Sequence, residues 1–147
     1  MIQELINYTL LADKLVIGIF LQSGKEMPEA ERLFSHILNA QHIWIKRILN
    51  EPQDHSIFDV HPPESFEPYQ LQNGGQLLDI VQTKNLTMPV VYTNSQGDNF
   101  VNVLQDILFH IVNHSTYHRA QVAAQFRLAG VNPPVTDFIM LKRQGEL

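Results

Sequence analysis

Two histidines one helical turn apart, His114 and His118, lie in the segment HIVNHSTYHRAQ, and His110 precedes them by another turn. Side chains four residues apart lie on one side of an α-helix, about 5 to 6 Å from each other, so two imidazoles with this spacing can bind a common ion. The apolar positions of the segment fall on the same side, which predicts that the histidines face the interior of the fold. Burying an imidazole without a partner costs about 1 to 3 kcal/mol, so a metal ion or a hydrogen-bond network must satisfy each of them.

A third metal-ligand candidate is His36, which lies at the edge of the apolar face of the segment 28–50. His42 falls on the polar side of the same segment and is expected to point outward. Inward histidines on two facing helices predict a three-ligand metal site with an open fourth position. His110 is the spare candidate: it is expected to support a ligand or to be a core histidine bonded to a carbonyl, and it could replace one of the three.

Several alternative chemistries lack a required residue. The chain contains no cysteine, so neither a thiolate ligand nor a cysteine nucleophile is available. The HSTYH pair has the spacing of a zinc peptidase motif, but no glutamate follows its first histidine, so the general base of such a peptidase is missing. The Glu-x-x-His pairs of a ferritin-like di-iron centre are absent as well. An iron site of two histidines and one carboxylate, supplied by Asp106 or Glu31, remains open.

The composition predicts one compact domain over residues 1–147, with 44% hydrophobic and 17% charged residues. The net charge is −5 and the lysines and arginines are scattered, so a nucleic-acid partner is not expected. The N-terminus lacks the pattern of a signal peptide, and no run approaches the ~18 apolar residues of a membrane span. No membrane partner is therefore expected, and a cytoplasmic location is the simplest interpretation.

Hydrophobic spacing is helical along most of the chain, and it predicts an all-α four-helix bundle. The expected helices cover about residues 2–21, 28–50, 68–85 and 99–129. The apolar residues of the first of them are Leu5, Leu11, Leu15 and Ile19, with Ile2 and Val16. Gly74 and Gly75 are expected to interrupt the third helix, and Gly130 to end the last one.

The connections between these helices carry further candidates. The proline-rich segment 51–68 is predicted to be a long loop, with His55 and His61 exposed on it. The segment MPVVYTNSQGDNF predicts a short β-hairpin or an extended arm before the last helix. Trp44 and Phe109 are expected to be core packing residues.

Two segments of the sequence resemble those of a known protein family. LFSHILNAQHIWIKRI and LQDILFHIVNHSTYHRAQVAAQFRLAG, the latter followed by VNPPVTDFI, resemble the two hallmark segments of the DinB-like (YfiT-like) superfamily of metal-binding four-helix bundles. The resemblance implies an up-down-down-up bundle. It also implies a divalent metal ion, usually nickel or zinc with iron or manganese as alternatives, held by His36, His114 and His118. The chain departs from the family pattern at Ala120, commonly glycine, and at Gln41, often glutamate.

The resemblance also implies a function. Members of the superfamily include thiol-dependent transferases and an isomerase, so we expect a metal-dependent enzyme that transfers bacillithiol, mycothiol or glutathione to an electrophilic small molecule. Asn113, Tyr117 and Arg119, together with His110, are weaker candidates for roles around the metal or its pocket. A homodimer is expected by the same resemblance. A metal-dependent hydrolase, and a non-catalytic stress-related bundle with a structural metal, remain as alternatives.

Overall fold

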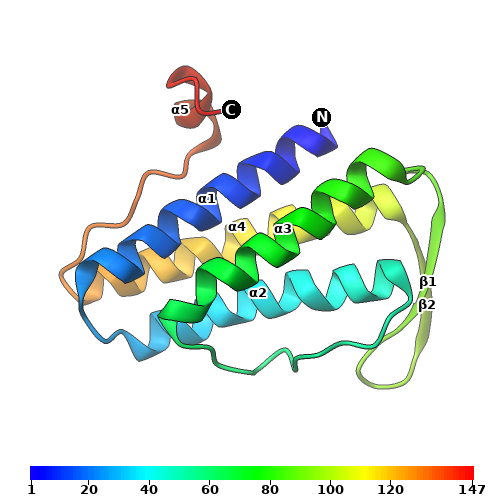
Figure 1. Ribbon diagram of the computed structural model, residues 1–147, viewed down its shortest axis with the longest axis horizontal. Coiled ribbons are helices and arrows are strands. Elements are labelled where there is room, and N and C mark those ends of the chain that lie inside the picture. Colours follow the sequence, from blue (N-terminus) through cyan, green and yellow to red (C-terminus); the bar gives the residue numbers. More distant parts are fainter.

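Four long helices form a bundle in the computed structural model, which describes all of residues 1–147. They are α1 (Ile2–Ser23), α2 (Pro28–Leu49), α3 (Phe66–Thr83) and α4 (Leu104–Leu128). In Figure 1, α1 and α4 run in one direction and α2 and α3 in the other, which is the up-down-down-up order. Both α1 and α2 pack against α3 and α4, so α1 and α2 lie diagonally across the bundle. The predicted all-α four-helix bundle is confirmed.

Local sequence explains where the first two helices begin and end. α1 ends at Gly24, whose φ of 63° is the left-handed conformation that glycine adopts without strain. α2 has Pro28 in its first turn, and the Glu31 carboxylate accepts a hydrogen bond from the Met27 amide just before the helix. Asn50 then ends α2 in the left-handed conformation, with a φ of 55°.

The segment between α3 and α4 forms the predicted hairpin. Strands β1 (Pro89–Thr93) and β2 (Asn99–Val103) pair antiparallel, with Val91 opposite Val101. The last helix was expected from Asn99, and this is wrong: α4 begins at Leu104, because Asn99–Val103 pairs with β1 instead of continuing the helix. The alternating valines of this segment favour a strand over a helix.

The expected interruption of the third helix at Gly74 and Gly75 is also wrong, because α3 is continuous from Phe66 to Thr83. Gly74 is buried where α3 approaches α1, and a Cβ atom there would lie 3.2 Å from Cδ2 of Leu10. The glycine thus permits close helix packing rather than a break. A one-turn 3₁₀ helix, η1 (Pro63–Ser65), precedes α3.

The core has two apolar halves, each built from all four helices. In the half next to the hairpin, the helices contribute Ile6, Ile45, Leu77 and Leu108, all fully buried. In the other half they contribute Phe20, Phe34, Phe66 and Phe126, with ring centroids of neighbouring pairs 4.9 to 5.6 Å apart. Between the two halves, buried polar side chains form a layer across the bundle; they are Asp13, Gln41, Asn73, Ser115 and Arg119.

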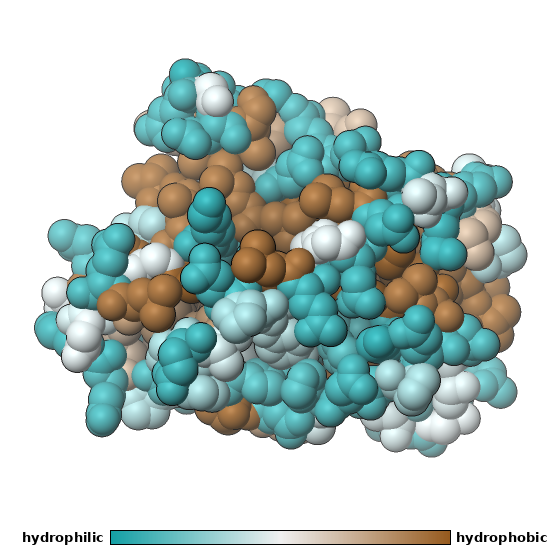
Figure 2. All heavy atoms as spheres, viewed as in Figure 1, coloured by the Kyte–Doolittle hydropathy of each residue, from teal (hydrophilic) through white to brown (hydrophobic).

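The expected apolar face of α1 is only partly correct. Val16 is buried as expected, whereas Ile2, Leu5, Leu11, Leu15 and Ile19 are only partly buried. Other buried positions of α1, such as Ile6, Ala12 and Asp13, were not expected. Figure 2 shows hydrophobic residues at the surface along α1, among hydrophilic ones. None of the helices combines the length and the apolar character that crossing a bilayer requires.

Two segments outside the bundle pack along it. Residues 51–62, which we call the strap, run back from the end of α2 to the start of α3 (Figure 1). After α4, the chain follows α1 and ends in the short helix α5 (Phe138–Arg143), which the sequence did not predict. Tyr8 of α1 fixes this tail: its hydroxyl donates to the Thr136 carbonyl at 2.9 Å, and its ring contacts Phe138 edge-on.

Candidate metal centre

Three histidines from two helices meet on one side of the polar layer. His36 comes from α2, and His114 and His118 come from successive turns of α4, the helix that packs most extensively against α2. One ligand nitrogen from each side chain lies within 4.8 Å of the other two. The Nε2 atoms of His36 and His114 are 3.2 Å apart. Two nitrogens bound to one tetrahedral zinc ion are about 3.3 Å apart, so this pair fits a shared metal ion.

The other ring nitrogens of two of these histidines are held by the protein. Nδ1–H of His36 donates to the Ile57 carbonyl of the strap at 3.4 Å, and Nδ1–H of His118 donates to Oε1 of Gln121 at 2.7 Å. Each bond leaves the Nε2 lone pair free to bind a metal ion, and such partners orient metal-ligating histidines. We infer this assignment of protons from the acceptors, which are both oxygens.

The environment of His36 and His114 keeps both imidazoles neutral. Burial, reinforced by the neighbouring histidines, lowers the pKa of His114 to about 4. Burial also lowers the pKa of His36, again with a neighbouring histidine acting in the same direction. A neutral imidazole can bind a metal ion without first losing a proton. The donor set therefore fits a divalent transition metal.

The three-histidine group opens on two cavities, one on each side. One has a volume of about 490 Å³ and is lined by His36, His118, Gln121, Phe58 and the ion pair of Glu29 with Arg32. The other, of about 520 Å³, is lined by His36, His114, Trp44, Arg47 and residues of the strap and the hairpin. An ion held by the three histidines would thus be reachable by small molecules.

The other residues that the sequence proposed for the site are not among the three mutually close ligands. His110 is exposed; its ring is 5.6 Å from that of His114 and 5.3 Å from Trp44, and it is not among the mutually close ligands. Tyr117 is 64% exposed and contacts the His118 ring edge-on. Asn113 is exposed. Phe109 was expected in the core, and this is wrong, since it is 55% exposed on α4.

Arg119 points into the core instead of the cavities. Its guanidinium donates to the Asp13 carboxylate at 2.8 Å, and both side chains are almost completely buried. The Gln41 amide donates to the same carboxylate at 2.7 Å and to the Ser115 hydroxyl at 3.2 Å. Burial raises the pKa of Asp13, and Arg119 and Gln41 oppose that rise. Gln41, where the family often has glutamate, is thus part of the buried polar layer.

No carboxylate oxygen belongs to the group of mutually close ligand atoms that the three histidines form. A site of two histidines and one carboxylate is therefore not present here. Asp106 is exposed and lines a separate cavity with His110. Glu31 accepts the Met27 amide at the start of α2. The structure therefore favours the all-histidine site over the iron site that the sequence left open.

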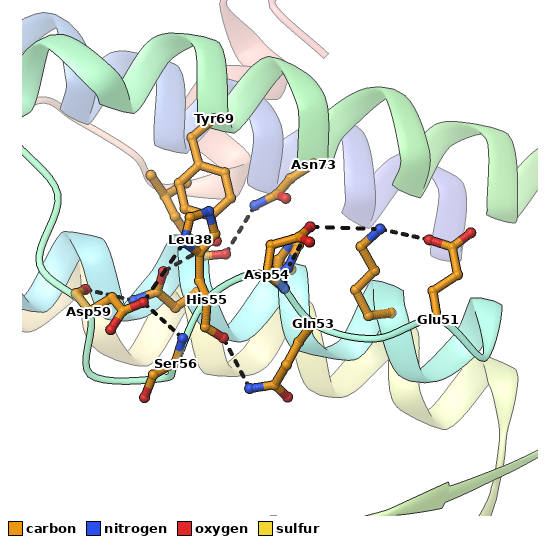
Figure 3. A network of polar contacts seen from close by, with 12 residues as sticks. Leu38, Glu51, Gln53, Asp54, His55, Ser56, Asp59, Tyr69 and Asn73 are labelled. Carbon is orange, nitrogen blue, oxygen red and sulfur yellow. Dashed lines mark hydrogen bonds and ion pairs between the residues drawn. The ribbon is translucent and has the colours of Figure 1, made fainter.

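A second group of histidines, comprising His42, His55 and His61, lies where the strap packs on α2, around the Tyr69 ring; Figure 3 shows this region, with His55 and Tyr69 labelled. The sequence predicted His42 to point outward, and this is wrong: it is 1% exposed, and its Nε2 accepts a hydrogen bond from the Asp54 amide at 3.0 Å. His55 and His61 were expected to be exposed and are instead half-buried against the Tyr69 ring. The strap covers this face of α2, which a helical wheel cannot show.

Asn39 of α2 anchors the strap to the bundle. Its amide donates to the carbonyls of Ile57 and Asp59, at 3.3 and 2.7 Å, and its oxygen accepts from His61 Nε2 at 2.7 Å. The Ile57 carbonyl is the one that also accepts from His36. The strap therefore connects the buried second histidine group to the candidate metal centre.

Sequence reasoning missed three contributors to the centre. Gln121 lies three residues after His118, a spacing that places both on one face of the helix, so this partner could have been proposed. The Ile57 carbonyl and the Phe58 ring, which stacks on His36 at 6.5 Å, belong to the strap. No local pattern in a loop shows which helix it will contact.

Comparison with known proteins agrees with this fold. The model of the DinB family matches residues 9–146, so the chain belongs to the DinB family. Among curated proteins it is similar to Protein DinB of Bacillus subtilis (strain 168), with 32% identity over 62 residues, which is 42% of this chain and 36% of the relative. The match thus spans only about a third of that relative's length. No solved structure matches the chain.

Proposed function

We propose that this protein is a divalent-metal-dependent enzyme that transfers a low-molecular-weight thiol, such as bacillithiol, mycothiol or glutathione, to an electrophile. The observation that carries the proposal is the three-histidine group of His36, His114 and His118, which opens on a cavity on each side. A structural metal site normally has four protein ligands, whereas a catalytic one keeps a position open. Two cavities meeting at one open position suit a reaction of two small molecules.

When bound, a divalent cation held by neutral imidazoles lowers the pKa of a thiol or water that binds to it. In the proposed reaction the thiol gives its proton to solvent, its sulfur forms a bond to the electrophilic carbon, and the leaving group departs with its bonding electrons. The chain contributes the oriented histidines, with Ile57 and Gln121 fixing the rings of His36 and His118. Phe58 of the strap lies beside His36, with nearly parallel rings whose centroids are 6.5 Å apart, and it lines the same cavity.

Hydrolysis is less well supported, because a hydrolase needs a base near the attacking water. The only carboxylate that lines either cavity is Glu29, and it is already paired with Arg32. The cavity on the Arg47 side contains no acidic residue. Thiol transfer needs no such base, since a thiol loses its proton far more readily than water does.

The proposal is tested by loading the protein with zinc or nickel and measuring the loss of each thiol in the presence of a generic electrophile such as 1-chloro-2,4-dinitrobenzene. We expect turnover with at least one of the three thiols and none in His114→Ala. Ester hydrolysis without thiol transfer would replace the proposal with the hydrolase. Metal binding without either activity would favour a structural metal.

Nickel and zinc are the metals we propose, with iron or manganese as alternatives, since three imidazoles suit several divalent ions.

A homodimer and a cytoplasmic location remain predictions. The partly buried leucines along α1 are the surface on which we would look for a second copy.

A further inference from the structure

An arginine without an acidic partner lines the cavity on the hairpin side of the three-histidine group. Arg47, from the last turn of α2, is partly buried, and its guanidinium makes no ion pair and no side-chain hydrogen bond. It lies over the ring of Trp44, 4.6 Å from the centroid, and 5.2 Å from that of Tyr92. The two rings hold the charge in place while leaving its five donors unused.

The surroundings of Arg47 make this charge available to a ligand. Arg32, on the opposite side of the histidines, is neutralised by Glu29, and Lys46 is neutralised by Glu51. In contrast, the cavity shared by Arg47, His36 and His114 contains no carboxylate. Its wall also carries the hydroxyls of Ser56 and Ser95. Burial lowers the pKa of Arg47, an effect that an anion bound beside it would reverse.

The position of Arg47 sets the length of such a ligand. Its guanidinium packs over Trp44, which is eight residues after His36 and therefore about 12 Å further along the helix axis. A molecule that reaches both ends must separate its reacting atom from its anionic group by several bonds. Glutathione does this, because its two carboxylates lie several bonds from the sulfur, on either side of its central cysteine. A two- or three-carbon mercapto acid is too short.

We propose that this cavity binds the carboxylate end of an elongated small molecule through Arg47, with the other end of that molecule at His36 and His114. The inference rests on the proposed thiol transfer and refines it, because the carboxylate is that of the thiol. Bacillithiol and glutathione carry carboxylates, whereas mycothiol ends in an uncharged inositol. Arg47 therefore selects the first two.

The test is equilibrium binding measured by calorimetry on the zinc-loaded protein. The probes are glutathione, its diethyl ester, γ-glutamyl-alanyl-glycine, which has the same carboxylates and no sulfur, and 3-mercaptopropionate. The variants are Arg47→Gln, Arg47→Lys and, as the matched control on the opposite cavity, Arg32→Gln. Thermal melting confirms that each variant is folded, and zinc content confirms that each retains its ion.

We expect Arg47→Gln to lower the affinity for glutathione at least about tenfold, which is the effect of losing one charge-assisted hydrogen-bonded pair. The diethyl ester and 3-mercaptopropionate should bind equally to both proteins, Arg47→Lys should be intermediate, and Arg32→Gln should match wild type. γ-Glutamyl-alanyl-glycine should bind more weakly than glutathione, because it lacks the sulfur, but its affinity should depend on Arg47 in the same way. Equal affinity of wild type and Arg47→Gln for both tripeptides would overturn the proposal, whatever the outcome of the thiol-transfer assay.

Discussion

The carboxylate of Asp13 and the guanidinium of Arg119 meet at 2.8 Å in the middle of the bundle, where neither side chain is more than 3% exposed. Arg119 follows His118 directly on α4, so the pair fastens α1 to the helix that carries two of the three metal-ligand candidates. It lies between the two apolar halves of the core. We interpret this polar layer as the support that fixes the rotation of α4 about its axis.

Removing one partner of this pair is expected to destabilise the fold strongly. Asp13→Ala leaves the Arg119 guanidinium buried without its counter-charge, which costs about 3 to 5 kcal/mol of unfolding free energy. Urea unfolding measures this loss of unfolding free energy. Arg32→Ala, which breaks the exposed pair with Glu29, is the control and should cost less than about 1 kcal/mol. Equal losses in the two variants would contradict the importance of the buried pair.

The hydrogen bond from His118 to Gln121 predicts an indirect effect on metal binding. Gln121→Ala removes the acceptor of Nδ1–H at 2.7 Å, so the ring is no longer held in its orientation. Loss of such a partner lowers metal affinity about 10- to 100-fold. Zinc affinity, measured by competition with a chromophoric chelator, checks this. Gln125→Ala alters the same cavity without touching a histidine and should bind zinc like wild type.

The metal-free protein is expected to lose stability as it is acidified. Burial lowers the pKa of His42 below its ordinary value of 6.5, and protonation of Nε2 would break its bond from the Asp54 amide. The unfolded chain takes up the proton near pH 6.5 and the folded protein only at lower pH. The contribution of His42 is therefore complete above pH 6.5 and decreases below it, by at most about 1.4 kcal/mol per pH unit.

Unfolding in urea at several pH values between 7.5 and 4.5 tests this contribution. His42→Gln keeps an acceptor for the Asp54 amide and cannot titrate, so its stability should fall less steeply with acidification than that of wild type. Other titrating groups, including Asp13 and His114, are common to both proteins and cancel in the comparison. Parallel pH profiles of the two proteins would show that His42 is not responsible.

Two glycines in helix interiors can be replaced with a gain in stability. A Cβ atom at Gly18 or Gly75 would meet no atom within 4 Å, and alanine restricts the unfolded chain. Gly75→Ala should raise the unfolding free energy by about 0.5 to 1 kcal/mol. Gly74→Ala, beside it, should gain less, because its Cβ would press on Leu10. A larger gain at Gly74 would show that α1 and α3 are not packed as described.

The bundle was predictable because its helices are long and their apolar positions recur with helical spacing. The convergence of His36 with His114 and His118 followed from two helical wheels, each of which turned these histidines toward the interior. The sequence misplaced Phe109 and His110, which are both exposed: His110 lies beside the Trp44 ring of α2, at the edge of the bundle instead of in its core.

The orientation of His42 could not be predicted, because it depends on the strap. A wheel assigns the polar side of a helix to solvent, but here the strap lies over that side, held by Asn39. The burial of Arg119 could not be predicted either. This charged side chain, next to a candidate metal ligand, is buried because it pairs with Asp13 on another helix. Long-range partners of this kind leave no local signal in the sequence.

The central claim is that His36, His114 and His118 bind one divalent metal ion, and zinc affinity of their alanine variants tests it most directly. We predict one ion per chain in wild type and a loss of more than about 100-fold in affinity for each of the three variants, with folding checked by circular dichroism. His110→Ala, one turn before His114 and outside the group, should bind zinc like wild type. Undiminished zinc binding by His114→Ala would contradict the account.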